Sequence, residues 1–113
     1  MSEFSPELEK AVDDLVGQII MSKEYSRYQK QKEILRDNPS LREDVDRIRH
    51  LSEELRKYED DDSAYDEYER IENEYEELYE NRRVHDFIQA ETDFIRQFQD
   101  IYARIVSGID FDL

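Results

Sequence analysis

The chain has 113 residues, room for one domain, and its 31 acidic and 16 basic side chains give a formal net charge of −15. This charge repels phosphate backbones and anionic lipid, so we expect no direct binding to nucleic acid and no membrane insertion. The absence of cysteine excludes disulfides, thiolate metal sites, iron–sulfur clusters and cysteine nucleophiles.

The 28 Leu, Ile, Val and Phe residues form about a quarter of the chain, above the roughly 20% below which a highly charged sequence stays disordered. Two Gly and two Pro are too few to turn the short strands of a sandwich or barrel. The sequence therefore predicts a single all-α domain over 1–113, an antiparallel helical bundle of about five helices with a long C-terminal helix.

The N-terminal half predicts three helices. Ser5 and Pro6 suit the start of the first helix, and a break near Ser22 starts the second. Asn38 and Pro39 are the firmest boundary, because proline disfavours helix before it and suits the first position after it. The first helix has an apolar stripe of Leu8, Ala11, Val12, Leu15, Val16, Ile19 and Ile20. The third has a buried face of Leu41, Val45, Ile48, Leu51, Leu55 and Tyr58.

The C-terminal half predicts an acidic loop at 59–63, where the chain reverses, and then two helices. A break at 81–83 separates them, since Arg82 and Arg83 suit a helix C-terminus. The last helix, 84–106, is about 35 Å long, and a short tail follows at 108–113. In the fourth helix, 65–80, the side chains that we expect to face inward are those of Tyr65, Tyr68, Ile71, Tyr75, Leu78 and Tyr79.

The last helix has an apolar face two columns wide, which the shorter helices of one protomer leave partly uncovered. We therefore expect a homodimer that buries part of this helix against its symmetry mate, the alternative being a self-sufficient monomeric bundle. The candidate dimer or core face consists of Phe87, Ile88, Phe94, Ile95, Phe98, Ile101, Tyr102 and Ile105.

The two histidines fit no metal motif. Zinc and di-iron helices need a metal-binding histidine with a second ligand at fixed helical spacing, but Arg47 and Arg82 stand three residues before His50 and His85. We expect His85 at a helix start or on the surface. The sequence predicts no metal, no cofactor and no catalytic residue.

The acidic loop also fails as a calcium loop. Counting from Asp60, the sixth position is Tyr65, where the turn requires Gly, and the twelfth is Ile71, where a bidentate Glu is needed. Phosphate-binding glycine loops and nucleophile elbows are absent as well, so the sequence indicates a protein that is not an enzyme.

The segment from Glu59 to Glu80 carries twelve acids and one base, Arg70. One interpretation is a docking surface in which acids and tyrosines meet a basic groove on a partner protein. The other is that the tyrosines are core and the acids solubilise the outer face. We call the candidate docking residues the acidic ridge: Tyr65, Tyr68, Glu74, Glu76 and Glu77.

The helix boundaries and core positions together resemble the YlbF/YmcA family of small helical bacterial proteins. The resemblance covers nearly the whole chain and is carried by Ser22–Tyr25, Tyr28, Leu35, Asn38–Pro39, Leu41, Val84, Phe87, Ala90, Glu91, Phe98, Ile101 and Ile105. It implies self-association and a regulatory role in competence, sporulation and biofilm formation. It also implies partners among family paralogues and a complex with the membrane-anchored ribonuclease Y that influences mRNA processing.

The chain departs from some relatives, which carry a cysteine-bearing tail implicated in iron–sulfur binding, so no cluster is carried over. The resulting expectation is a cytoplasmic regulator or adaptor that works through protein–protein contacts. An alternative is an acidic decoy that occupies the nucleic-acid-binding surfaces of basic partners, whose binding added salt would abolish. Two further hypotheses are that the chain is a metal-dependent helical enzyme and that its high charge reflects a halophilic origin.

Overall fold

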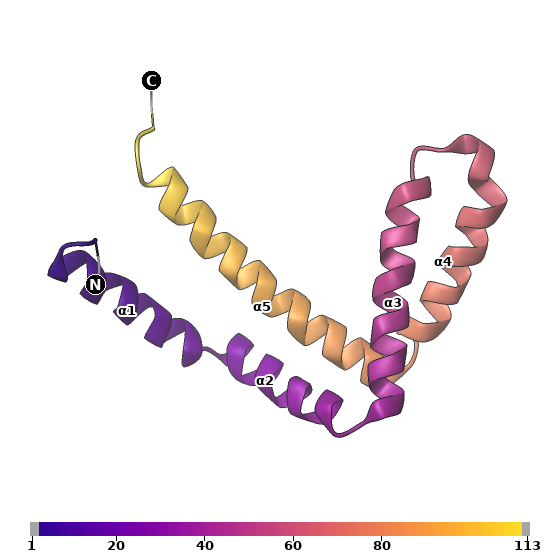
Figure 1. Cartoon of the computed structure of the whole chain (residues 1–113), viewed down its shortest axis with the longest axis horizontal. Coiled ribbons are helices and arrows are strands. Elements are labelled where there is room, and N and C mark those ends of the chain that lie inside the picture. The colour runs from indigo at the N-terminus through magenta and orange to yellow at the C-terminus, as the bar shows by residue number, and fades with distance from the viewer. Residues whose placement is uncertain (1–2, 112–113) are drawn as a thin grey trace.

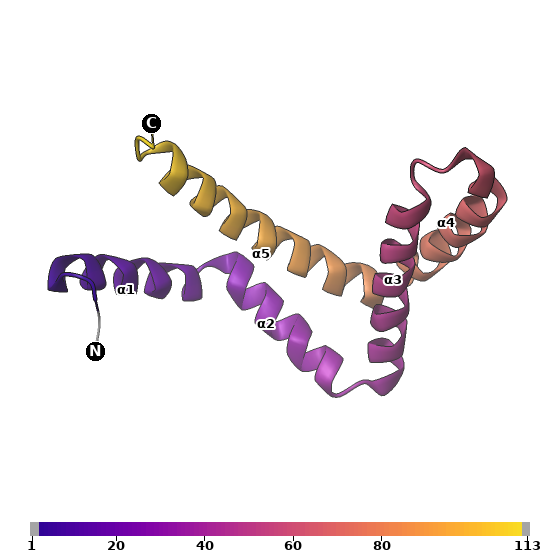
Figure 2. The ribbon, with the colours of Figure 1, turned by 45° about the horizontal axis from the view of Figure 1, so that its top comes forward.

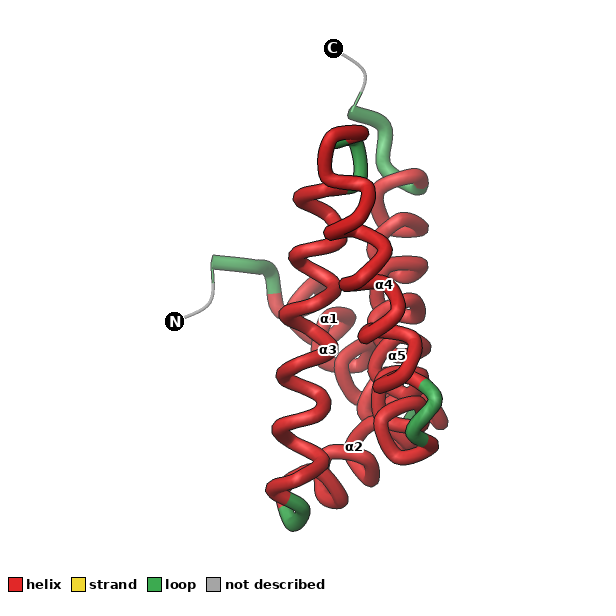
Figure 3. Tube along the Cα trace, turned by 90° about the vertical axis from the view of Figure 1, so that its right-hand side faces the viewer, coloured by secondary structure: helices red, strands yellow, loops and turns green. Residues whose placement is uncertain are grey.

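The computed structural model describes residues 3–111, so Met1, Ser2 and the last two residues of the tail lie outside the described residues. The described chain contains helices and loops and no strand, as Figure 3 shows. Its elements are α1 (Pro6–Ile20), α2 (Lys23–Arg36), α3 (Pro39–Tyr58), a 3₁₀ turn η1 (Asp62–Ala64), α4 (Tyr65–Tyr79) and α5 (Arg82–Ser107). The predicted all-α class and five α-helices are confirmed.

Side-chain caps set the helix starts. Ser5 accepts a hydrogen bond from the Leu8 amide at 3.1 Å, and Ser22 and Asn38 cap α2 and α3 in the same way at 3.2 Å. Each cap satisfies an amide that has no partner inside its helix. Asn81 caps α5, accepting from the amides of Arg83 and Val84.

The predicted break at 81–83 is confirmed, but the role given to its two arginines is wrong. Arg82 and Arg83 begin α5 instead of ending α4, which stops at Tyr79. The Asn81 side chain decides this, because its cap fixes the first turn of the new helix directly after it.

The helices form an open V (Figure 1). One arm contains α1, α2 and α5, and the other is the antiparallel hairpin of α3 and α4. The Cα radius of gyration is 19.2 Å, whereas a compact domain of 113 residues has about 13 Å. The chain is therefore far more extended than a closed bundle of its length.

The buried core lies where the two arms meet. Phe87 of α5 is at its centre, 2% exposed, with the Tyr28 ring of α2 at 6.2 Å and the Arg49 guanidinium of α3 at 5.7 Å from its ring centroid. The buried side chains are Leu41, Val45, Ile48, Leu51, Ile71, Val84, Phe87 and Ala90. Side chains of α2, α3, α4 and α5 pack together in this core, whereas α1 contributes no buried residue to it.

Replacing Phe87 by Ala is expected to lower the free energy of unfolding by about 3–5 kcal/mol, because the change empties the centre of a small core. Urea denaturation followed by circular dichroism measures this loss. The matched control is Tyr65→Ala at a side chain that is 66% exposed, which we expect to change stability by no more than about 0.5 kcal/mol. Equal losses in the two variants would contradict this position of the core.

Candidate interaction surfaces

The predicted acidic ridge lies on the α3–α4 hairpin, but its five residues do different things. Tyr65 is 66% exposed, so the prediction that it faces inward is wrong: it starts α4 beside the loop, beyond the reach of α3. Tyr68 is half-buried, while Glu76 and Glu77 are exposed. The ridge therefore presents one free aromatic ring and two free carboxylates.

Glu74 is tied across the hairpin by a partly exposed ion pair. Its two carboxylate oxygens accept hydrogen bonds of 2.9 and 3.0 Å from Arg47 of α3, and Arg70 lies 4.0 Å away on its other side. The Arg47 hydrogen bond lowers the pKa of the Glu74 carboxyl. Arg70 also pairs with Glu67 and lowers the pKa of that carboxyl. The Arg47–Glu74 pair therefore joins α3 to α4, whereas the pairs of Arg70 lie within α4.

Tyrosines line the inner face of the same hairpin. Tyr75 and Tyr79 stack with ring centroids 6.0 Å apart, and the His85 ring of α5 meets Tyr79 edge-on at 4.7 Å. Burial raises the pKa of Tyr75, and burial followed by the nearby carboxylates of Glu72 and Glu59 raises that of Tyr68. The inner tyrosines thus pack as core, and His85 is exposed in the first turn of α5, as predicted.

The second surface is the apolar face of α5, which the structure divides into two halves. Phe87 is buried, and Ile88 and Phe94 are half-buried against α2 and α3. Ile101 is also half-buried. Beyond Phe94 the same face becomes the exposed stripe, which we define as Ile95, Phe98, Tyr102, Ile105 and Val106. The face predicted as dimer or core is therefore core in its first half and open in its second.

Polar and aromatic contacts hold α2 to the first half of α5. The rings of Tyr25 and Tyr28 both lie 5.4 Å from that of Phe94, centroid to centroid. Glu91 of α5 accepts hydrogen bonds from the Tyr28 hydroxyl at 3.4 Å and from Arg49 of α3 at 2.6 Å. Burial, then the Glu91 charge, raises the pKa of the Tyr28 hydroxyl. Glu91 thus ties α2 and α3 to α5.

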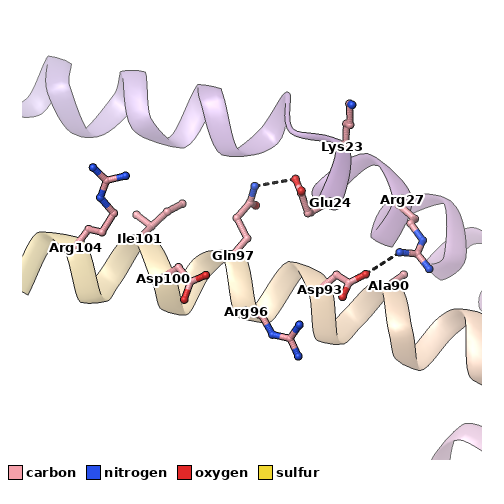
Figure 4. Close-up of a pocket in the computed structure, with 10 residues that line it drawn as sticks. All are labelled: Lys23, Glu24, Arg27, Ala90, Asp93, Arg96, Gln97, Asp100, Ile101 and Arg104. Carbon is pink, nitrogen blue, oxygen red and sulfur yellow. Dashed lines mark hydrogen bonds and ion pairs between the residues drawn. The ribbon is translucent and has the colours of Figure 1, made fainter.

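A cleft lies between the N-terminal end of α2 and the middle of α5 (Figure 4). Arg27 pairs with Asp93 across it at 2.8 Å, and Gln97 donates to Glu24 at 2.9 Å. These two bonds join α2 to α5 directly, as in an ordinary helix–helix contact. In residues 3–111, no group of three or more His, Asp or Glu side chains could hold a metal ion.

Sequence reasoning did not identify Arg47 and Arg49, the two α3 arginines that reach acids on other helices. Both stand among charged residues of α3, where only the apolar positions form a recognisable helical pattern. Their partners depend on how the helices pack.

Among residues 3–111, the helices are too short or too polar to span a membrane.

Glu74→Gln is expected to lower the melting temperature at pH 7, because it removes the charge that Arg47 binds. Since the Glu74 pKa is lowered in the fold, its contribution is present above the unfolded pKa of about 4.3 and is lost as the pH falls through the folded value. The variant and the wild type should therefore melt alike at acidic pH. Thermal melts at a series of pH values measure the difference.

Glu76→Gln is the matched control, since it removes the same charge from a carboxylate that makes no ion pair with a described residue. It should melt like the wild type throughout. A Glu76 variant that loses as much as the Glu74 variant would contradict the assignment.

The chain matches the family described as "Control of competence regulator ComK, YlbF/YmcA" over residues 8–110. No curated protein and no solved structure matches it significantly. Among the positions that carried the sequence resemblance, Ser22 and Asn38 are helix caps and Leu41, Val84 and Phe87 are buried core, whereas Phe98 and Ile105 are exposed. The chain therefore belongs to the YlbF/YmcA family.

Proposed function

We propose that this chain is a non-enzymatic, cytoplasmic regulatory protein that acts by binding other proteins, as a homodimer and adaptor. Membership of a family described as controlling a competence regulator supports the regulatory role. The observation that carries the adaptor role is the separation of two surfaces of different chemistry. The turned view in Figure 2 shows the α3–α4 hairpin on one arm of the V and α5 on the other. The hairpin carries the acidic ridge, and α5 carries the exposed stripe.

Two such surfaces allow one protein to hold two partners at once. Tyr65, Glu76 and Glu77 on the hairpin suit a basic groove, in which the ring supplies contact area and the carboxylates supply charge. The exposed stripe suits an apolar helical surface. By the family resemblance, we propose family paralogues and a ribonuclease Y complex as the partners, with an influence on mRNA processing.

The alternative function is an acidic decoy for nucleic-acid-binding proteins, which the net charge of −15 favours. The two functions differ in their response to salt. The Debye length falls from about 10 Å at ~0.1 M to about 3 Å at ~1 M, so purely electrostatic binding weakens steeply. Binding that includes apolar anchors loses much less.

The test is a pull-down with the full-length chain from nuclease-treated lysate of its native cell, washed with increasing salt, followed by identification of the bound proteins. Ribonuclease Y or family paralogues retained at ~0.5 M salt are the expected result, because apolar contacts survive screening. Recovery of nucleic-acid-binding proteins alone, all released by salt, would replace the adaptor function with the decoy.

A paired variant tests the acidic ridge. Glu76→Gln with Glu77→Gln is expected to weaken capture of the hairpin's partner several-fold at low salt, since two free carboxylates are lost. The matched control is Glu33→Gln with Glu43→Gln, which removes the same charge from exposed positions on α2 and α3. Equal capture by the two double variants would mean that the ridge acids only solubilise the helix.

A further inference from the structure

The arm formed by α1 and the second half of α5 has two apolar faces with no cover in the described chain. On α1, the exposed fractions are 50% for Leu8, 43% for Val12 and 47% for Val16. On α5, Phe98 is 55% exposed and Tyr102 is 64% exposed. Each face is continuous along its helix, since its residues recur at helical spacing. We call this region the open arm, consisting of α1 and residues 95–107 of α5.

The chain as a whole exposes more surface than a compact monomer of its mass. The accessible surface is 9240 Å², whereas a compact monomer of 13.8 kDa exposes about 6,600 Å², which leaves about 2,600 Å² in excess. A partner in a standard interface buries about 800 Å² of its surface. The excess of the whole chain, to which the open arm contributes, is therefore larger than the surface that one partner buries in a standard interface.

The junction between α1 and α2 keeps α1 away from the exposed stripe of its own chain. The Ser22 hydroxyl bonds to the Ile19 carbonyl at 2.7 Å and to the Gln97 amide oxygen of α5 at 3.3 Å, and it caps α2 through the Tyr25 amide. These bonds fix the turn against α5. From that turn α1 and α5 diverge toward the two termini, as the views in Figures 1 and 2 both show.

The charges on α1 and on the second half of α5 favour one way of pairing the helices of two copies over another. The polar positions of α1 hold four acids, Glu7, Glu9, Asp13 and Asp14, against one lysine, so two α1 helices brought together would repel. The second half of α5 offers Arg96 and Arg104, which form no ion pair with any described residue, and the acid Asp100. An α1 helix therefore meets a more favourable surface on α5 than on another α1.

The lengths of the two faces also match. The 15 residues of α1 span about 22 Å, and residues 95–107 of α5 span about 20 Å. With a twofold axis, one contact between α1 and α5 is made twice, so both apolar faces of both copies are covered.

We propose that a second copy of this chain covers the open arm, with α1 of each copy packed on the exposed stripe of the other. This rests on the self-association in the proposed function and deepens it, because α1 supplies half of every contact. The result is a four-helix interface at the centre of the dimer. The α3–α4 hairpin of each copy stays outside it, because the hairpin forms the other arm of its own chain.

Sedimentation equilibrium of the full chain gives the first measurement. The expected mass is twice 13.8 kDa. Val12→Asp and Phe98→Asp should each weaken the dimer at least about tenfold, since each buries a charge in the interface. The control Ile34→Asp changes an exposed apolar side chain of α2 outside the open arm and should leave the dimer unchanged. Circular dichroism confirms that each variant keeps its helices.

A mass of 13.8 kDa at every concentration would contradict the proposed dimer. A mass above that of the dimer would contradict its twofold arrangement. Neither result depends on partner capture by the hairpin, so a failure of the dimer is distinguishable from a failure of the adaptor function.

Cysteine crosslinking tests which helices meet, because the chain has no cysteine of its own. Val12→Cys and Phe98→Cys proteins are mixed under mild oxidation, and the crosslink between unlike chains is expected to exceed either crosslink between like chains. Ile34→Cys mixed with Phe98→Cys is the control and should stay uncrosslinked. A dominant like-chain crosslink would overturn the pairing, as would an internal crosslink in a chain that carries both cysteines.

Discussion

The apolar face of α5 is longer than the helices that cover it, and the rest of the structure depends on this mismatch. The helix has 26 residues, but α2 covers it only from Ser22 onward, opposite Gln97, and α1 before that turn diverges from it. Before that point Phe87 and Glu91 gather side chains from α2 and α3 and build the small core. Beyond it, apolar side chains face outward. The exposed apolar surface of this arm follows from this one difference in length.

The helix boundaries could be predicted because local chemistry sets them. Ser5, Ser22 and Asn38 each cap the helix that the sequence assigned to them, and Pro39 stands at the first position of α3. A cap involves residues only two or three positions apart, so the signal is complete within a short stretch of sequence. The boundary error at Arg82 arose where a cap and a basic pair suggested opposite ends.

The surfaces could be predicted only as candidates, because exposure depends on contacts between distant residues. The spacing that made Tyr65 look inward is satisfied in the helix, but α3 ends too early to cover it. In the sequence, Glu74 cannot be told apart from the exposed acids Glu76 and Glu77. Its position opposite Arg47 of α3 is what allows it to pair across the hairpin. In the same way, periodicity identified the whole face of α5 without showing where its cover stops.

The division of α5 into a covered and an open half is the central claim, and concentration-dependent amide hydrogen exchange of the full chain tests it most directly. Exchange is slow where a helix is packed and fast where it opens to water. Peptides from 95–107 and from α1 should gain protection as the protein concentration rises, while those from 84–94 stay equally protected throughout. Uniform, concentration-independent protection along α5 would contradict the division.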